Sequence, residues 1–436
     1  MAEVCPFLGI RYNRELVKDL AQVICPPYDV ITPQQQKHYY GKSDYNAIRL
    51  EHPLPVVATT RQSNYNKYSG VAVTFQRWLK EGVLQVEDCP AFYLHDHYFT
   101  YSGEKKRRRG LIARLRLGPW GNGIYPHEET FSKTKSDRLQ LMRACRANFS
   151  PLFALYQDSQ GKFGKILSEA SQGKPVIKFA DSGESHVVWA ITEPKFIHRI
   201  SGFINTQALY MADGHHRYET ALAYQQERAH IIVSGERQSL AGKEAFNYVM
   251  MTLVDFFDPG LVLFPVHRLV RGIAPSALAR LEGQLSQIFI LKIIPLTDGL
   301  ISSLKHKMIE GAFLVILGLV PQSLVLLKQR QGISVDAMMP ENHSQPYKKF
   351  NVSLLNHLIL GRMLGVAQDS KDIAYTVDVD EACQQIEEGK YQLAFLLGPP
   401  QPEIVKAIVE AKDRMPRKST YFYPKLPTGL IINPLG

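Results

Sequence analysis

The chain has 436 residues, of which 45% are hydrophobic and 21% are charged, and its formal net charge is +10. This composition is that of an ordinary globular protein, and the length allows two or three domains with a sizeable core. The five cysteines are scattered without a Cys-x-x-Cys pair, which argues against a disulfide-rich secreted domain and against a cysteine zinc site.

The most hydrophobic stretch of the chain, residues 313–327, is interrupted by Gly318 and Pro321. The apolar segments before and after this interruption are both much shorter than the ~20 apolar residues that span a bilayer. The first residues also lack the basic and apolar segments of a signal peptide. We therefore expect a cytoplasmic protein without a membrane partner.

The positive net charge raises the question of a polyanionic partner. The densest basic cluster, Lys105–Arg109, follows a turn at 102–104, and we expect it to be the solvated shoulder of a hairpin, with a nucleotide or nucleic-acid contact as the alternative. Aromatic residues do not interleave with these charges as a base-stacking surface requires. The basic balance alone therefore does not indicate a DNA-binding protein, and we do not expect a nucleic-acid partner.

Residues 1–123 are expected to form an N-terminal β-rich extension of short strands and turns. Helical spacing predicts a helix over 71–80, and alternation predicts paired strands over 92–101 and 110–117.

His95 and His97 would share one face of the strand expected at 92–101, because side chains alternate along a strand. Such a pair could bind a metal ion, but it is more often only a polar sheet face. The sequence therefore assigns no metal ligands.

Residues 124–264 are expected to form a central α/β domain. Their patterns predict a helix from Ser136, strands over 152–156, 174–179 and 185–192, a short helix from Pro194, a strand over 208–212, a helix over 218–228, and strands over 248–254 and 261–264.

Residues 265–436 continue as a C-terminal α+β domain, so the predicted fold class for the whole chain is α+β. The predicted helices cover 275–285, 354–364, 380–389 and 403–412, and the predicted strands cover 288–294, 391–397 and both arms of the hairpin at 313–327. The tail at 414–427 is rich in aromatic and basic residues between prolines. We expect it to pack onto the body, because a disordered tail seldom carries so many aromatics.

A polar run, Asp213-Gly214-His215-His216-Arg217, joins an expected strand to an expected helix. The start of a helix presents unpaired N–H groups and the positive end of its dipole, so it binds anions. Gly214 allows the turn and the close approach of a phosphate, because no Cβ intervenes. His215 and His216 supply imidazole donors, and Arg217 supplies a planar fork for phosphate oxygens. We therefore predict a phosphate site, with Asp213 orienting a histidine or holding Mg²⁺ through water.

A metal-dependent hydrolase is the rival interpretation of this run, because Asp213, His215 and His216 could all be ligands. The sequence offers no His-x-x-x-His pair and no second carboxylate cluster with ligand spacing. A helix start also directs its positive end at the ligand, which suits phosphate better than a cation.

A second candidate site is the run His127-Glu128-Glu129-Thr130. Transfer of phosphate to an alcohol needs a carboxylate near the attacking hydroxyl and positive groups around the phosphoryl group. Glu128 would be that base, although both glutamates could equally be solvated residues ahead of a helix. Lys133, Lys135 and Arg138 follow, and they either reach a nucleotide or face water.

These runs belong to a larger pattern that also contains Cys25–Val30, Asn46–Glu51, Lys135–Leu139 and Lys418–Lys425. Over nearly the whole chain, the pattern resembles a widespread prokaryotic family of unknown function that is described as serine-kinase-like. The Asp-Gly-His-His-Arg run and the helix after it resemble the signature of the ParB/sulfiredoxin superfamily, closest to its free-serine kinases. That narrower match covers about residues 124–225.

The resemblance implies a central ParB/sulfiredoxin-like domain and a nucleotide-dependent kinase that makes O-phospho-L-serine from free L-serine. ATP or ADP would be the donor, with Mg²⁺ as helper. It implies Glu128 as general base, with Glu129 as the fallback. The predicted catalytic residues are Glu128, Asp213 and His216, and the predicted nucleotide-binding residues are Gly214, His215, His216, Arg217, Thr130, Arg138 and Lys418. Lys418, Ser419 and Lys425 could instead belong to a basic stretch that stabilises a packed tail.

Alternatives to the kinase remain open at this point. A nucleotide-binding ParB-like regulatory or DNA-binding protein is the first, although no helix-turn-helix segment is evident. A phosphatase acting on phosphoserine is another. Sulfiredoxin chemistry requires a cysteine in the turn, where this chain has His215 and His216. The expected partners are a nucleotide and L-serine or a related hydroxyl compound, and the sequence leaves open whether the chain forms a homodimer.

Overall fold

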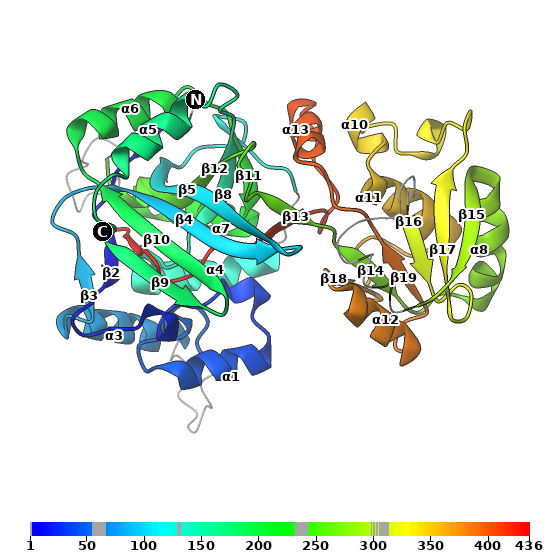
Figure 1. Ribbon diagram of the computed structural model, residues 1–436, viewed down its shortest axis with the longest axis horizontal. Helices are drawn as coiled ribbons and strands as arrows, with labels where there is room; N and C mark the ends of the chain where they lie inside the picture. The colour runs from blue at the N-terminus through cyan, green and yellow to red at the C-terminus, as the bar shows by residue number, and fades with distance from the viewer. Residues whose placement is uncertain are drawn as a thin grey trace. The chain divides into compact units, whose positions relative to one another are not determined.

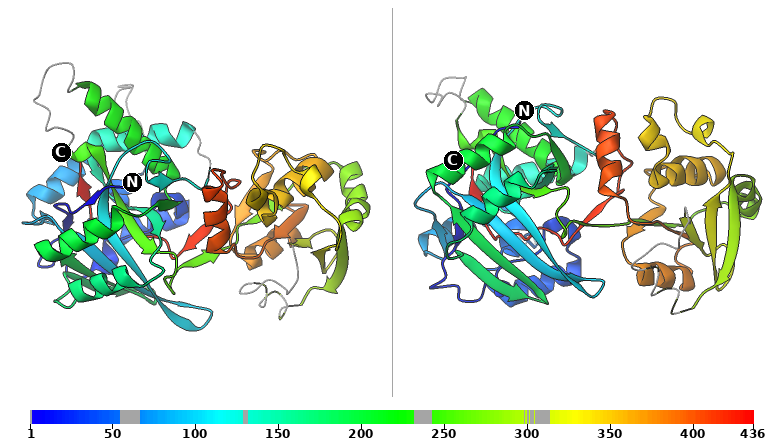
Figure 2. Two further views of the ribbon diagram at one scale, coloured as in Figure 1. Left: turned by 90° about the horizontal axis from the view of Figure 1, so that it is seen from above. Right: turned by 45° about the horizontal axis from the view of Figure 1, so that its top comes forward.

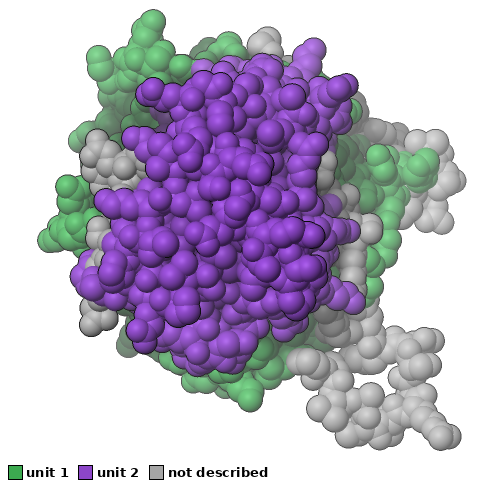
Figure 3. Space-filling model, turned by 90° about the vertical axis from the view of Figure 1, so that its right-hand side faces the viewer, with its two compact units in different colours: residues 1–126, 130–261, 424–436 green, residues 127–129, 262–423 purple. Residues whose placement is uncertain are grey.

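The computed structural model describes residues 2–54, 67–128, 132–231, 243–297, 299, 301, 304 and 314–436. By its internal contacts the chain divides into two compact units, which Figure 3 distinguishes by colour. Unit 1 comprises residues 1–126, 130–261 and 424–436, and unit 2 comprises residues 127–129 and 262–423. The three-domain division made from the sequence stays a prediction.

Unit 1 is built on a nine-stranded mixed sheet with the strand order β6-β11-β8-β12-β5-β4-β10-β9, and β1 pairs with β5. These strands are β1 (Val4–Cys5), β4 (Phe92–Tyr101), β5 (Glu104–Arg116), β6 (Ile124–Tyr125), β8 (Leu152–Tyr156), β9 (Ile177–Asp181), β10 (Glu184–Ile191), β11 (Leu209–Asp213) and β12 (Tyr248–Asp255). The hairpins β4–β5 and β9–β10 are antiparallel, as the sequence predicts, whereas β12 runs parallel to β8.

Helices cover both faces of this sheet (Figures 1 and 2). They are α1 (Pro33–Lys42), α2 (Ile48–Glu51), α3 (Lys67–Lys80), α4 (Ser132–Cys145), α5 (Lys162–Ala170), α6 (Pro194–Ile204) and α7 (His215–Ile231). Because side chains alternate along a strand, Leu111 of β5 packs with α5 and α6, while its neighbour Ile112 packs with α3. The sheet therefore separates two hydrophobic cores.

The basic cluster Lys105–Arg109 lies within β5, which begins at Glu104. The prediction of a solvated shoulder is wrong for its last two residues. Arg108 is 2% exposed and donates to the carbonyl of Pro424, and Arg109 forms an ion pair of 2.7 Å with Asp96 on the neighbouring strand β4. These acceptors come from other segments, so the local sequence could not indicate them.

The end of the chain returns to unit 1. Its last strand, β21 (Asn433–Pro434), pairs with β7 (Ala147–Asn148), and backbone hydrogen bonds join Ile432 to Ile10 and Thr428 to Cys25. A further short pair joins β2 (Ile10–Tyr12) to β3 (Leu84–Val86). Residues 428–434, which follow the tail predicted at 414–427, therefore pack onto unit 1, and the packing of the tail itself stays a prediction.

Unit 2 is built on a six-stranded antiparallel sheet with the strand order β15-β17-β16-β19-β14-β18. Its strands are β14 (His267–Val270), β15 (Phe289–Pro295), β16 (Leu314–Leu317), β17 (Ser323–Gln329), β18 (Ile373–Thr376) and β19 (Leu393–Leu396), and β13 (Val262–Phe264) pairs separately with β20 (Tyr421–Tyr423). Its helices include α8 (Pro275–Ile288), α10 (Gln345–Lys348), α11 (Asn351–Leu354), α12 (Val379–Glu387) and α13 (Pro402–Glu410). The predicted hairpin over 313–327 is present as β16 and β17, and Phe313 lies outside the described residues.

The helix predicted over 354–364 takes a different form. The chain is α-helical over Asn351–Leu354 and then continues as a π-helix over Leu355–Met363. Hydrophobic spacing indicates a helix but does not distinguish its hydrogen-bond pattern. In the described part of the chain, no helix combines the length and the apolar character that crossing a membrane requires.

Candidate functional site

The predicted sequence of strand, turn and helix around Gly214 is present in unit 1. β11 ends at Asp213 and α7 begins at His215. Gly214 has a φ of 95°, in the region that favours glycine, and a Cβ there would lie 2.7 Å from Cδ2 of Leu152. Both the backbone conformation and the lack of space therefore require glycine at this turn.

Replacing Gly214 by alanine should lower the free energy of unfolding by roughly 1–3 kcal/mol, because it adds backbone strain and a clash with Leu152. Urea unfolding would measure this loss. Gly103→Ala is the matched control, because Gly103 has a φ of 79° with open space around its Cβ position. If the two variants lose equal stability, the clash with Leu152 does not contribute to the loss in Gly214→Ala.

Asp213 is paired with a lysine from the end of the chain. Nζ of Lys425 lies 2.8 Å from Oδ2 of Asp213, and the two side chains are 14% and 23% exposed. Burial alone would raise the pKa of Asp213, but Lys425 and Arg217 outweigh it and hold that pKa well below its usual range. Asp213 is therefore an ionised carboxylate with an ammonium group beside it, at the start of α7.

The two histidines of the turn lie in the first turn of α7. His215 is buried, and its ring centroid is 6.1 Å from that of Trp120. The backbone carbonyl of His216 accepts a hydrogen bond of 2.7 Å from the hydroxyl of Thr220. Because the first N–H groups of a helix lack acceptors within it, this position is suited to an anion.

Arg217 directs its guanidinium into unit 1. Nη1 donates to Oγ of Ser150 at 2.9 Å and to the carbonyl of Pro151 at 3.1 Å. Burial would lower the pKa of Arg217, but the charges of Asp29 and Asp213 outweigh it and raise that pKa. This charged side chain thus contributes positive potential beneath the turn while its donors contact the protein.

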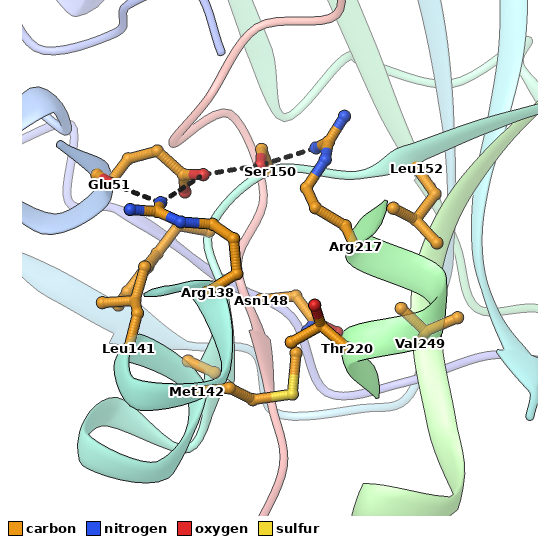
Figure 4. Close-up of a pocket in the computed structure, with 12 residues that line it drawn as sticks. Glu51, Arg138, Leu141, Met142, Asn148, Ser150, Leu152, Arg217, Thr220 and Val249 are labelled. Atoms are coloured by element: carbon orange, nitrogen blue, oxygen red, sulfur yellow. Dashed lines mark hydrogen bonds and ion pairs between the residues drawn. The ribbon is translucent and has the colours of Figure 1, made fainter. Parts of the chain in front are cut away.

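A small cavity of about 40 Å³, with a mostly apolar lining, lies beside Arg217 (Figure 4). Ser150 connects Arg217 to Glu51, because its hydroxyl accepts from Arg217 and donates to Oε1 of Glu51 at 3.2 Å. Oε1 of Glu51 also lies 3.7 Å from Nη1 of Arg138. Burial raises the pKa of Glu51, while Arg138 and Arg217 act in the opposite direction. Glu51 therefore interacts directly with Arg138 and, through the hydroxyl of Ser150, with Arg217.

Arg138 is held within this network and is 5% exposed. It donates to the carbonyl of Glu51 at 2.8 Å, to the hydroxyl of Tyr68 at 2.7 Å and to Asp137 at 2.6 Å. Its guanidinium carbon also lies 4.1 Å from the ring centroid of Tyr28. Its predicted role in nucleotide binding stays a prediction.

The sequence interpretation gave no role to Glu51, Tyr28 or Ser150. The first two lie in the runs Asn46–Glu51 and Cys25–Val30 that carried the family pattern, so the pattern was the available signal. Lys425 also lay in such a run, but its pairing with Asp213 spans 212 residues and has no local signature.

The remaining predicted site residues belong to unit 2 or lie outside the described residues. Oε1 of Glu128 accepts a hydrogen bond of 3.2 Å from the backbone N–H of Ser419. Lys418 is exposed, and its carbonyl accepts from Arg268 at 2.9 Å. Glu129 and Thr130 are outside the described residues, as are the side chains of Lys133 and Lys135.

Several solved structures are similar to this chain at low identity. A free serine kinase in complex with AMP is 12% identical with a TM-score of 0.34, and the match covers 72% of this chain and 86% of that one. A conserved hypothetical protein from Pyrococcus furiosus is 13% identical with a TM-score of 0.33, covering 73% and 93%. SbnI from Staphylococcus aureus, truncated at its C-terminus, is 11% identical with a TM-score of 0.32, covering 72% and 84%. At these TM-scores the likeness carries no argument about function.

No curated protein matches the chain. A family model does match it, over residues 4–354, and is described as "Protein of unknown function (DUF1015)". Because this match spans most of the 436 residues, the chain belongs to the DUF1015 family.

Proposed function

We propose that this protein is a nucleotide-dependent kinase of small molecules, with free L-serine as the favoured acceptor. The observation that carries the proposal is the turn at Gly214, where Lys425 pairs with Asp213 just before α7 and the charged Arg217 lies in the first turn of that helix. Positive groups gathered at a helix start suit the phosphates of a nucleotide. The resemblance of the sequence to free-serine kinases within the ParB/sulfiredoxin superfamily supports the same reaction.

In the proposed reaction, the hydroxyl oxygen of the acceptor attacks the terminal phosphorus of ATP or ADP. The bond from that phosphorus to the bridging oxygen breaks, and the nucleotide leaves one phosphate shorter. Glu128 takes the proton of the hydroxyl group as general base, with Glu129 as its fallback. Mg²⁺ neutralises charge on the phosphate oxygens when it is bound.

The residues of the turn have separate roles in this proposal. The imidazoles of His215 and His216 and the backbone of Gly214 hold phosphate oxygens. Arg217 acts through its charge, because its guanidinium donates to Ser150 and Pro151. Asp213 positions Lys425, and it reaches Mg²⁺ only through water. Thr130, Arg138 and Lys418 are further proposed contacts of the nucleotide.

The test is to incubate the protein with Mg²⁺, L-serine and either ATP or ADP, and to measure phosphoserine by ³¹P NMR. Glu128→Gln should lower the rate by roughly 10²–10⁴-fold while leaving nucleotide affinity intact. Glu403→Gln is the matched control, because Glu403 is an exposed glutamate of α13 in the same unit. It should retain the full rate.

Calorimetry with ATP and with ADP decides between the outcomes. If neither nucleotide binds, the kinase proposal is wrong. If a nucleotide binds but no phosphoserine forms from ATP or from ADP, the result favours a nucleotide-binding regulatory protein of the ParB type. Salt-dependent binding to DNA would then be the next measurement.

A further inference from the structure

Three histidines and a glutamate gather on one face of the unit 1 sheet, away from the turn at Gly214. His95 and His97 are on β4, and His186 and Glu184 are on the neighbouring strand β10. The register pairs His97 directly with His186 and pairs His95 with Val188. All three histidines are therefore on the face that also carries Tyr93 and packs toward α3.

The four side chains are in close contact. Nε2 of His97 lies 2.7 Å from Oε2 of Glu184, and Nε2 of His95 lies 3.0 Å from Nδ1 of His186. The ring centroids of His97 and His186 are 4.1 Å apart. One ligand atom from each of His97, His186 and Glu184 lies within 4.8 Å of the other two. Small side-chain adjustments would bring three such atoms around a single ion.

We infer that His97, His186 and Glu184 form a binding site for a divalent transition-metal ion, with zinc as the best match. Two imidazole nitrogens and one carboxylate oxygen are ligands that zinc accepts, and three protein ligands leave a fourth tetrahedral position for water. Mg²⁺ is a poor match, because it prefers six oxygen ligands.

His95 is a positioning residue in this site. Its Nε2 lies 3.0 Å from Nδ1 of His186, so it can accept a proton held on Nδ1, and that tautomer leaves Nε2 of His186 available for the metal. Metal-bound histidines commonly hold their second nitrogen in such a hydrogen bond.

Arg108 opposes the binding of a cation here. Its Nη2 lies 3.4 Å from Nδ1 of His97, and its Nη1 is held by the carbonyl of Pro424. The carboxylate of Glu184 offsets this positive charge, because the two groups attract each other. For zinc to bind Nε2 of His97, the proton shared by that nitrogen and Glu184 has to move to Nδ1, and Arg108 has to turn its Nη2 away from Nδ1.

The experiment is zinc titration of the full-length protein by calorimetry, with the melting temperature as a second readout. We expect one zinc ion per chain at this site and a rise in melting temperature of roughly 5 °C at a hundredfold excess of free zinc over its Kd. Mg²⁺ at the same concentration should not change the melting temperature through this site. Cobalt should give the visible absorption of a tetrahedral ion with nitrogen and oxygen ligands.

The variants separate this site from adventitious binding. Glu184→Gln should weaken zinc binding by at least tenfold, and His186→Gln should abolish it. His198→Gln removes an exposed histidine of α6 in the same unit and should leave this binding event unchanged. If His186→Gln does not fold, the cobalt spectrum of the wild type and the zinc affinity of Glu184→Gln still decide. Zinc binding that is unaffected by Glu184→Gln, or an octahedral cobalt spectrum, would overturn the inference.

Discussion

Lys425→Met is expected to lower the free energy of unfolding by roughly 3 kcal/mol at neutral pH. The substitution keeps the length of the side chain but leaves the carboxylate of Asp213 without the ammonium 2.8 Å away. The pKa of Asp213 then rises from its low value in the wild type, because only Arg217 and His215 still oppose the effect of burial. Urea unfolding of both proteins would measure the difference. Lys418→Met is the control for stability, because Lys418 is exposed, and it should change stability by no more than about 0.5 kcal/mol.

The effect of Lys425→Met should also depend on pH. In the wild type, the pKa of Asp213 in the folded protein is well below the 3.8 of an unperturbed aspartate, so the pair stabilises the protein fully above that pH. This stability is lost as the pH falls further and the carboxylate takes up a proton. The difference between wild type and variant should therefore be largest at neutral pH and shrink below about pH 4. A difference that stays constant down to pH 2 would show that Lys425 acts only by packing.

Lys425 also tests the proposed kinase site. If its ammonium contributes to phosphate binding, Lys425→Met should weaken nucleotide affinity by roughly tenfold to a hundredfold. Asp213→Asn keeps Lys425 and releases it from its partner, so it should leave nucleotide affinity equal or higher. A double-mutant cycle then separates the coupling of the pair from the contribution of Lys425 to binding.

Glu51→Leu is expected to be the most destabilising substitution in unit 1, with a loss of roughly 3–5 kcal/mol. Glu51 is 3% exposed and lies within reach of Arg138 and of Ser150. Leucine would leave the buried guanidinium of Arg138 without the negative charge of Glu51, and it would remove the carboxylate that accepts from Ser150. Thermal or urea unfolding would measure the loss.

Two further variants make this prediction specific. Glu51→Gln keeps the shape and an acceptor for Ser150 but removes the charge, so it should lose less than Glu51→Leu. Glu15→Gln is the control on an exposed glutamate of the same unit, and it should be near neutral. Equal and small losses for both substitutions at Glu51 would mean that the arginines find other acceptors.

Much of the secondary structure could be predicted, because it depends on neighbouring residues. The short apolar run of β8 and the glycine between β11 and α7 are local signals, and the structure has these elements where the sequence places them. The location of Arg108 within a strand was missed because a strand with charges on both faces lacks the alternation that identifies it.

The contacts within the candidate sites, in contrast, could not be predicted from neighbouring residues. Lys425 meets Asp213, Ser150 links Glu51 to Arg217, and His186 pairs with His97 across two strands. Each contact joins segments that are far apart in the sequence, and the residues beside them show no spacing that could reveal it. Only the order of strands in the sheet brings them together, and no local pattern contains that order.

The return of the chain end to unit 1 has a consequence for synthesis of the protein. Unit 1 uses residues 1–126 and 130–261 together with residues 424–436, and unit 2 is made between its second and third segments. While the ribosome is still adding residues, β7 has no partner in β21, and Asp213 has no Lys425. A nascent chain can therefore complete unit 2 first, whereas unit 1 can close only after residues 424–436 have left the ribosome.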